Sequence, residues 1–353
     1  MEVKEKDHMF RIKAQSSNAL AANTLVEELQ RYFVNQLATV VCSRNAQACF
    51  QAVEWFRDQG RHGGGIRYVA NNDQVFNRGS VNSSQIHYDD DEHKGLSSAT
   101  ALSAIIHPLN PYAPSVHMHI SWTEMKNGKG YWRMMADLNP AIKNSQAVLT
   151  FTNTLKQVTA GQYHAGSVQG DRYFHIPALE RHRGAAHFYL EDYASGDLEA
   201  DFTMAKLLGK SVIETYVELV QQAMQHHPDP TEDDYRKQRA YHTLYFFQVL
   251  TLDRGTTSGL LVHDQNDLGI MGSLPAHIDK QLLASWQEKM TAPQDQLLSA
   301  ILQVLSDESP CAINDGIKLA LAAVVRQHYT RNPHALTMQA QGHVIPPTVE
   351  NHR

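Results

Sequence analysis

The stretch VHMHISWT, residues 116–123, decides the fold class together with the turn NGKG (127–130) and the run YWRMMAD (131–137) on its C-terminal side. Apolar side chains at 116, 118, 120 and 122 alternate with polar side chains at 117, 119, 121 and 123. This period of two is typical of a strand that buries one face of a sheet. An Asn-Gly turn between two such runs indicates a β-hairpin. The stretch therefore predicts two antiparallel strands with one apolar face and one polar face.

Outward from this hairpin, we expect β structure over residues 66–137 and helices on both sides of it. Apolar side chains recur at helical spacing in several segments, while shorter apolar runs indicate further strands. The predicted helices cover 23–58, 145–160, 202–226 and 277–330, and the predicted additional strands cover 185–192, 243–253 and 258–263. Because hairpins occur without regular βαβ alternation, the sequence predicts an α+β fold: a single domain with a large antiparallel β-sheet flanked by helices.

The composition is that of a globular protein with no reason to bind nucleic acid or membranes. The chain has 353 residues, is 42% hydrophobic and 19% charged, and carries a formal net charge of -6. A negative balance does not attract nucleic acid or anionic lipid, and no apolar run reaches bilayer length. Residues 1–13 mix both charges and lack the apolar core of a signal peptide, so we expect a cytoplasmic location. Cys42, Cys49 and Cys311 include no CxxC pair, and Cys42 and Cys49 are predicted to be buried thiols because they fall in helical patterns.

Five blocks of sequence, in one order, carry a family resemblance. The most specific is AIIHPLNPYAPSVH, residues 104–117, with its His-Pro-x-Asn-Pro-Tyr-x-Pro-x-x-His pattern. The other four are a glycine-rich stretch with its following strand, a Trp-containing strand with an Asp-Leu-Asn-Pro turn, an Arg-Gly strand and an Asp-Arg-Gly-Thr motif, at 63–87, 131–140, 183–192 and 252–256. Over roughly residues 25–305 the chain resembles the oxygen-dependent coproporphyrinogen oxidase family.

The resemblance implies an enzyme of porphyrin biosynthesis, usually a homodimer, with one domain built on a large antiparallel sheet. Members of the family oxidise and decarboxylate two propionate side chains of a tetrapyrrole to vinyl groups with molecular oxygen, and no organic cofactor is expected. On this basis the chain divides into an N-terminal segment (1–22), a coproporphyrinogen-oxidase-like domain (23–305), and a C-terminal helical extension with an irregular tail (306–353). The expected activity is that of an oxygen-dependent oxidative decarboxylase.

The resemblance also implies which residues carry the chemistry. Arg254 matches the arginine that holds the propionate, and a guanidinium suits this task because its planar fork pairs with a carboxylate and stays charged. Asp253 matches the aspartate that faces the pyrrole N–H, where a carboxylate stabilises positive charge on the oxidised ring. His117 matches the histidine of proton transfer, and these three side chains are predicted to converge in one cleft. The predicted substrate-binding residues are Ser103, His107, His119 and Arg183.

Each of these residues also has a plainer structural interpretation. An Asp-Arg pair before Gly-Thr is usually a turn, and a single histidine in a strand is more often a structural hydrogen-bonding residue. Ser103 and Arg183 could instead satisfy backbone groups or form an ion pair in the core. His107 precedes Pro108 and could serve only to hold its loop. Both interpretations stay open on the sequence alone.

The chain departs from the family pattern at positions that would bind a highly charged substrate. The Asn-Val-Arg-like segment of the family is His119-Ile120-Ser121 here, so a propionate-binding arginine is missing. A pair of histidines in the helix after the Asp-Leu-Thr-Pro turn is replaced within 150–153, so no metal site is predicted, although a divalent metal stays an open alternative. Each charged pair lost from a buried site costs about 2–5 kcal/mol of binding. The losses favour a smaller or less charged substrate.

Three functions are therefore weighed. The first is an oxygen-dependent oxidative decarboxylase that resembles coproporphyrinogen III oxidase and turns propionate into vinyl. The second is the same chemistry on a smaller non-tetrapyrrole substrate, such as an electron-rich aromatic with a propionate-like chain. The third is a catalytically silent protein that binds a porphyrin or a partner chain. The presence of Asp253, Arg254 and His117 favours the first two, whereas the missing histidines and arginines favour the third.

Overall fold

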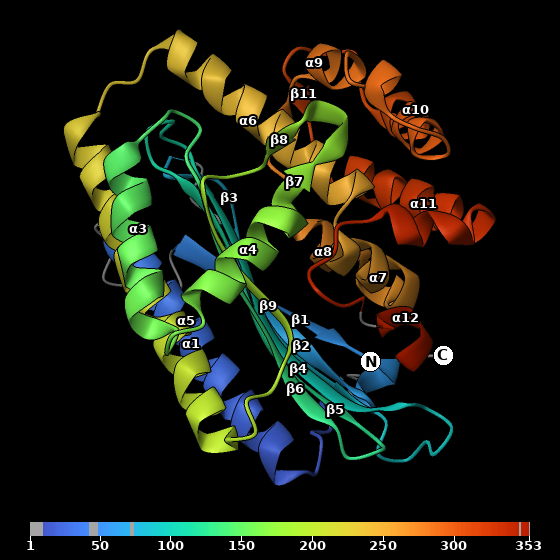
Figure 1. Cartoon of the computed structure of the whole chain (residues 1–353). Helices are drawn as coiled ribbons and strands as arrows, with labels where there is room; N and C mark the ends of the chain where they lie inside the picture. The colour runs from blue at the N-terminus through green and yellow to red at the C-terminus, as the bar shows by residue number, and fades with distance from the viewer. Residues whose placement is uncertain (1–9, 42–48, 71–73, 346, 353) are drawn as a thin grey trace, which may run out of the picture.

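A seven-stranded sheet forms the centre of the computed structural model, which describes residues 10–41, 49–70, 74–345 and 347–352 (Figure 1). All of its neighbouring strands are antiparallel, in the order β1-β2-β3-β4-β5-β6-β9. The strands are β1 (Phe50–Phe56), β2 (Gly63–Ala70), β3 (Phe76–His87), β4 (Leu96–Pro108), β5 (Ser115–Met125), β6 (Gly130–Asn139) and β9 (Ala186–Tyr193). The predicted hairpin is β5–β6, and the predicted α+β fold with a large antiparallel sheet is confirmed.

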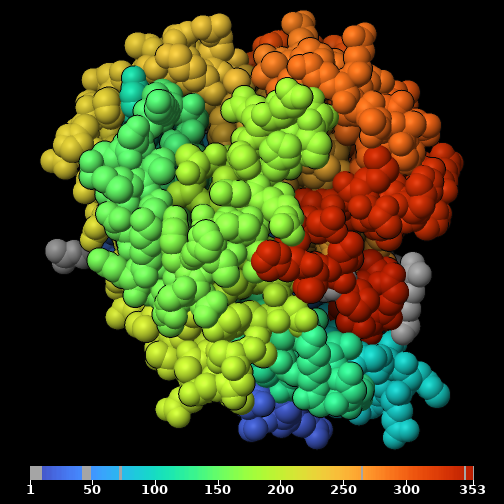
Figure 2. Space-filling view, viewed as in Figure 1, coloured from blue at the N-terminus to red at the C-terminus, as the bar shows by residue number. Residues whose placement is uncertain are grey.

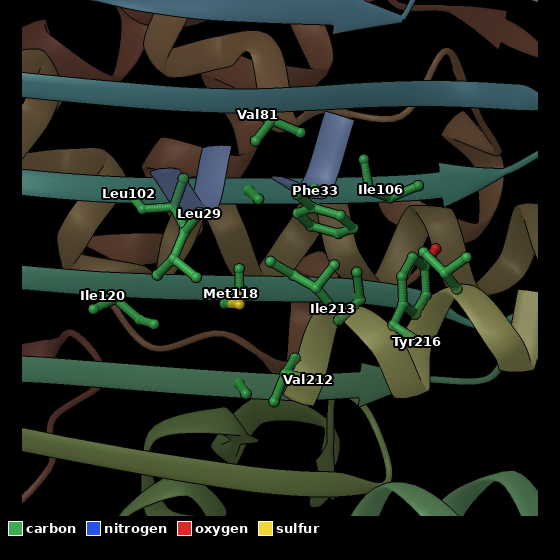
Figure 3. Packing of buried hydrophobic residues seen from close by; sticks show 14 of the residues in the cluster. Leu29, Phe33, Val81, Leu102, Ile106, Met118, Ile120, Val212, Ile213 and Tyr216 are labelled. Atoms are coloured by element: carbon green, nitrogen blue, oxygen red, sulfur yellow. The ribbon is translucent and has the colours of Figure 1, made fainter. Parts of the chain in front are cut away.

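One face of the sheet packs against the long helices α1 (Ser17–Val40) and α5 (Leu198–His226), with α3 (Ser145–Val158) beside them (Figure 1). Figure 3 shows this core from close by: side chains from the sheet, such as Met118, meet side chains from α1 and α5, such as Phe33. All of these side chains are almost fully buried. The apolar half of the predicted alternation in β5 therefore forms a dry interface with two helices.

A glycine lets α5 come close to α1 and to the sheet. A Cβ atom at Gly209 would lie 2.6 Å from Cδ1 of Leu29 and 3.0 Å from Cδ1 of Ile120. Atoms in a packed core do not approach so closely without displacement, so a larger side chain at Gly209 would push the helix away from the sheet.

The opposite face of the sheet is covered by α6 (Glu232–Thr251), α7 (Arg254–Val262), α8 (Asp267–Ile270) and α11 (Asp315–Arg331), and α4 (Tyr163–Phe174) packs against β9 (Figure 1). A second apolar cluster lies among these helices. It joins α6 to residues on both sides of position 305, for example Leu297 and Leu321. The helical extension predicted after residue 305 thus shares a core with the helices before it.

The remaining elements are short. They are η1 (Asp58–Gly60), β7 (His175–Ile176), η2 (Pro177–Leu179), β8 (Arg181–His182), η3 (Asp264–Asn266), η4 (Met271–Ser273), β10 (His277–Ile278), α9 (Lys280–Ala284), η5 (Gln287–Lys289), α10 (Gln294–Val304), β11 (Cys311–Ala312), η6 (Pro333–Met338) and α12 (Thr348–Asn351). Cys49 is a buried free thiol, as expected, and Cys311 is one too, whereas Cys42 lies outside the described residues. Among the described helices, none combines the length and the apolar character needed to cross a bilayer.

Two predicted strands are helices instead. Residues 243–253 belong mostly to α6, and residues 258–263 lie almost entirely in α7. Every residue of α6 from Tyr241 to Thr251 is buried, because the helix is enclosed between the sheet and the second apolar cluster. A helix buried on all sides has no polar face, so its apolar residues do not follow helical spacing, and the apolar run at 244–247 resembles a buried strand.

Near the N-terminus a strand was predicted as helix, because the predicted helix 23–58 extends too far. The helix α1 ends at Val40, and β1 occupies Phe50–Phe56. The apolar residues Phe50, Val53 and Phe56 are spaced by three, which imitates helical spacing. However, β1 is an edge strand with a largely exposed surface, so its alternation is weak.

Candidate active site

A cavity of about 290 Å³ lies between the polar face of the sheet and helices α6 to α8. Its floor consists of side chains from β3, β4, β5 and β6, and the N-terminal residues of α7 form part of its wall. The predicted site residues Ser103, His117, His119, Asp253 and Arg254 all line it. The structure thus brings together five of the seven predicted residues, although Asp253 and His117 are far apart in the sequence.

Strand register explains the floor of the cavity. Asn82 pairs with Ser103, Ser103 with His119, and His119 with Met135, so one row of side chains runs across four strands. Arg67 of β2 pairs with Asn82 and extends this row, and its buried Nε has no hydrogen-bond partner among the described residues. Cross-strand partners project from the same face of a sheet, so the polar half of each alternation becomes a continuous polar floor.

Asp253 is the N-cap of α7. Its Oδ2 accepts a hydrogen bond from the backbone N–H of Thr256 at 2.8 Å, and its Oδ1 accepts one from the Tyr173 hydroxyl at 2.8 Å. Burial by itself would raise the pKa of Asp253, but the attraction of His117, the Thr256 N–H, Arg133 and the Tyr173 hydroxyl outweigh it and hold the pKa below its usual value. Asp253 is therefore an anchored carboxylate at neutral pH.

Arg254 is the first residue of α7, and not the end of a strand as the predicted strand 243–253 implied. Only 6% of the residue is exposed, and neither Nη1 nor Nη2 has a hydrogen-bond partner among the described residues. Burial lowers the pKa of Arg254, yet a guanidinium with an ordinary pKa of 12.5 stays charged at neutral pH. A buried cation without a partner is costly, and an anion bound at the start of the helix would satisfy both the guanidinium and the helix dipole.

His117 is held from behind by a buried arginine. Nη2 of Arg183 lies 3.3 Å from Nδ1 of His117. Because a guanidinium only donates, Nδ1 must accept, and the proton of the neutral imidazole is then on Nε2. Burial, followed by repulsion from Arg183, lowers the pKa of His117 to about 4. At neutral pH His117 is consequently an uncharged ring that can donate from Nε2.

Arg183 does not line the cavity. It is fully buried, forms an ion pair with the equally buried Asp137, and donates to Oε1 of Gln248 at 2.8 Å. The predicted role of Arg183 in substrate binding thus finds no contact with the cavity, and the core ion pair considered as its alternative is present. Its position behind His117 makes Arg183 a positioning residue for that ring.

His107 is also away from the cavity. Its ring is fully buried, with Nδ1 2.8 Å from Oγ of Ser115 and Nε2 3.3 Å from the carbonyl oxygen of Ser273. Burial comes first among the causes that lower its pKa well below the usual value. These contacts agree with the alternative in which His107 holds its loop.

The structure adds a cation that the sequence motifs did not identify. Arg133 of β6 lines the cavity and stands opposite Ser121, the position at which the family arginine is absent. Its Nε lies 3.6 Å from Oε1 of Glu191. Burial by itself would lower the pKa of Arg133, but the attractions of Glu191, Tyr173 and Asp253 together outweigh it and raise the pKa. The hairpin register alone would have placed Arg133 on the polar face, because it alternates with the apolar Trp132 and Met134. Sequence reasoning also missed Tyr173, which donates to Asp253, and two residues of the C-terminal tail that line the cavity, Thr348 and His352.

The buried guanidinium of Arg254 lines a polar cavity beside an anchored aspartate, an arrangement whose charge and shape suit a small organic anion. The family model of coproporphyrinogen III oxidase matches residues 21–307. This chain belongs to the coproporphyrinogen III oxidase family.

Curated relatives agree with this membership at modest identity. The chain is 29% identical to the mitochondrial oxygen-dependent coproporphyrinogen-III oxidase of Rattus norvegicus over 296 residues, which cover 75% of this chain and 64% of the rat protein. It is 27% identical to the corresponding human protein, covering 75% and 63%, and 28% identical to that of Drosophila melanogaster, covering 77% and 72%. The match thus spans less than two thirds of the two mammalian proteins.

Proposed function

We propose that this protein is an oxygen-dependent oxidative decarboxylase that converts a propionate side chain on an electron-rich ring into a vinyl group. The observation that carries the proposal is the guanidinium of Arg254, buried beside Asp253 with no hydrogen-bond partner among the described residues. A carboxylate is the anion that fits its fork in a bidentate manner. Family membership supports the same chemistry.

The reaction balances with dioxygen as the oxidant. The bond between the terminal carboxylate and its neighbouring carbon breaks and releases carbon dioxide. One C–H bond breaks at the carbon attached to the ring, and the vinyl double bond forms. The two electrons released pass to dioxygen, which becomes hydrogen peroxide with one proton from that C–H bond and one from solvent. The residues of the cavity must therefore hold an anion, stabilise an electron-poor ring and assist oxygen reduction.

Three side chains divide this work. Arg254 binds the carboxylate until carbon dioxide leaves, and Asp253 accepts a hydrogen bond from a ring N–H and stabilises positive charge on the oxidised ring. His117, neutral and protonated on Nε2, donates to the oxygen species as it gains negative charge. The lowered pKa of His117, about 4, makes it a poor base at neutral pH, so its task is donation rather than proton abstraction.

The size of the cavity favours the second candidate, in which the substrate is smaller than a tetrapyrrole. Its volume of about 290 Å³ stands at the lower end of the range for ligand pockets, about 300–1,000 Å³. A single pyrrole or phenol ring with one propionate chain suits such a space, whereas four linked rings need several times more. Arg254 and Arg133 line this cavity. Arg133 is held by Glu191, whereas Nη1 and Nη2 of Arg254 have no hydrogen-bond partner among the described residues, in keeping with one bound carboxylate.

A comparison of substrates under air tests the proposal. The wild-type protein is incubated with coproporphyrinogen III and, separately, with a pyrrole bearing one propionate chain, and oxygen uptake, carbon dioxide and vinyl product are measured. We expect equal amounts of the three from the small substrate, and weak or no vinyl product from coproporphyrinogen III. Robust conversion of coproporphyrinogen III would overturn the change of substrate. If no propionate compound yields carbon dioxide in an oxygen-dependent way, the silent binding protein becomes the better explanation.

The family resemblance further supports a homodimer, and light scattering during gel filtration would measure its mass. The cytoplasmic location stays a prediction.

A further inference from the structure

The end of the chain contributes to a cavity that the family-matched residues do not complete. The family model ends at residue 307, but Thr348 and His352 line the cavity together with Asp253 and Arg254. Figure 2 shows the red C-terminal residues lying across this face of the molecule, next to the green residues of α4. We call residues 339–345 and 347–352 the tail segment.

The near end of the tail segment is attached beside the two candidate catalytic residues. The backbone N–H of Ala340 donates to the carbonyl oxygen of Leu252 at 2.9 Å, directly before Asp253 in the chain. Nε2 of Gln339 donates to Oγ1 of Thr257 at 2.5 Å, within α7. These two contacts bracket Asp253 and Arg254, so the tail segment begins at the wall that presents them.

The far end is attached to the connection between β3 and β4. Nζ of Lys94 donates to the carbonyl oxygen of His352 at 2.9 Å, and Nδ1 of the same histidine lies 3.1 Å from the Tyr88 hydroxyl. Val349, between the two ends, is 6% exposed and thus packs against the protein. A segment that is hydrogen-bonded at both ends and buries an apolar residue between them is a packed part of the fold rather than a loosely associated terminus.

The far attachment rests on a polar cluster that is itself well connected. Arg57 donates from Nη2 to the Tyr88 hydroxyl at 3.2 Å, and its Nη1 lies 2.8 Å from Nδ1 of His263. The ring of His263 meets the ring of His352 edge to face, with centroids 5.5 Å apart, and both histidines line the cavity. The tail segment thereby closes the cavity against a preformed surface.

We propose that the tail segment is the specificity-determining wall of the cavity, which admits one aromatic ring with a carboxylate-bearing chain and keeps a tetrapyrrole out. The inference rests on the proposed function, because it concerns the same cavity. Its physical basis is that Thr348 and His352 line the cavity and take up space that an open cleft would offer to further rings, while the buried Val349 holds this part of the tail segment against the protein. Removing this wall enlarges the space next to Arg254 without altering Arg254 itself.

Ligand binding, rather than turnover, tests the proposal directly. The probes are coproporphyrin III, followed by its fluorescence, and a pyrrole with one propionate chain, followed by calorimetry. The variants are a deletion of residues 340–353 and the double substitution Val349→Ala/His352→Ala, and the matched control is Ile345→Ala, at a residue of the same segment that is 54% exposed. We expect both variants to bind coproporphyrin III at least about tenfold more tightly than wild type, and the control to behave like wild type.

A substitution that adds volume covers the case in which the other variants do not fold. Thr348→Trp should fill part of the cavity and weaken binding of the small pyrrole at least about tenfold. The proposed role of the tail segment is disproved if folded variants keep the ligand preference of the wild-type protein. It is also disproved if the wild-type protein already binds coproporphyrin III as tightly as the variants do. If the variants change the ligand preference but no propionate compound is turned over, the role of the tail segment is supported and the proposed function is contradicted.

Discussion

The two faces of the central sheet have opposite designs, although they are built from the same strands. In β5, Met118 and Ile120 point into a closed apolar core under α1 and α5, whereas His117 and His119 point into a polar cavity under α6 and α7. On the first face, burial of apolar surface stabilises the fold. On the second, buried charges are arranged around an open space, which stabilises little by itself but prepares the protein for an anion.

The difference shows how a single sheet can separate stability from chemistry. The polar face tolerates the ion pair between Arg183 and Asp137 and the unpartnered guanidinium of Arg254 because the apolar face supplies compensating stability. Changes on the apolar face should therefore affect folding, and changes at the cavity-lining residues of the polar face should mainly affect ligands and pH dependence.

The largest effect is expected from the same substitution at two adjacent residues of β5. Met118→Asp places a charge in the apolar core and should lower the free energy of unfolding by more than about 5 kcal/mol. His119→Asp faces the cavity near Arg133 and should lower it by less than about 1 kcal/mol. Urea unfolding measures both values. Equal losses at the two positions would disprove the contrast between the faces.

The next effect concerns the buried ion pair on the polar face. Arg183→Met leaves the carboxylate of Asp137, which is fully buried, without its cation and should lower the free energy of unfolding by about 3–5 kcal/mol. The double variant Asp137→Leu/Arg183→Met removes both charges and should recover part of this loss. Because Arg183 also repels a proton from His117, NMR titration of Arg183→Met should show a higher pKa for His117. An unchanged His117 would contradict the positioning role.

Arg254→Ala should act on ligands and leave the fold intact. Loss of a bidentate contact worth about 2–5 kcal/mol should reduce kcat/KM roughly 30- to 5,000-fold, and Arg254→Lys should recover only part of it. Thermal unfolding should stay at the wild-type temperature or rise, because a buried cation without a partner is removed. Arg236→Ala, at an arginine whose side chain is 76% exposed, is the control. A folded Arg254→Ala protein with wild-type turnover would refute the assignment.

The smallest effect per residue is expected from pH. Burial comes first in lowering the pKa of His117 and His352 to about 4 and of His242 and His263 to about 3, from an ordinary value of 6.5. The unfolded chain takes up these protons first, so stability is intact above about pH 6.5 and falls as the pH drops towards 4. Replacing one of them, as in His242→Gln, should reduce the slope by up to about 1.4 kcal/mol per pH unit. Urea unfolding between pH 7.5 and 5 measures the slope, and an unchanged slope would show that the ring is not protected from protons.

The sequence predicted much of the sheet because its signal is local. Alternation with a period of two identifies a strand and assigns its faces within eight residues, and Met118 and His119 lie on the faces predicted for them. The family motifs likewise identified His117, Asp253 and Arg254, and the structure places all three on one cavity. Their chemical roles remain proposals.

Tertiary structure alone decided the features that depend on distant partners. Residues 243–251 and 254–262 are helical although their apolar runs resemble strands. In α6, enclosure on all sides removes the polar face that would identify a helix. Arg183 is withdrawn from the cavity by Asp137, and Arg133 is set opposite Ser121 by strand pairing. The tail segment reaches Leu252 and Lys94 across long separations in the chain. Local periodicity reports which side of an element is buried, whereas what it is buried against is fixed only when the chain folds back on itself.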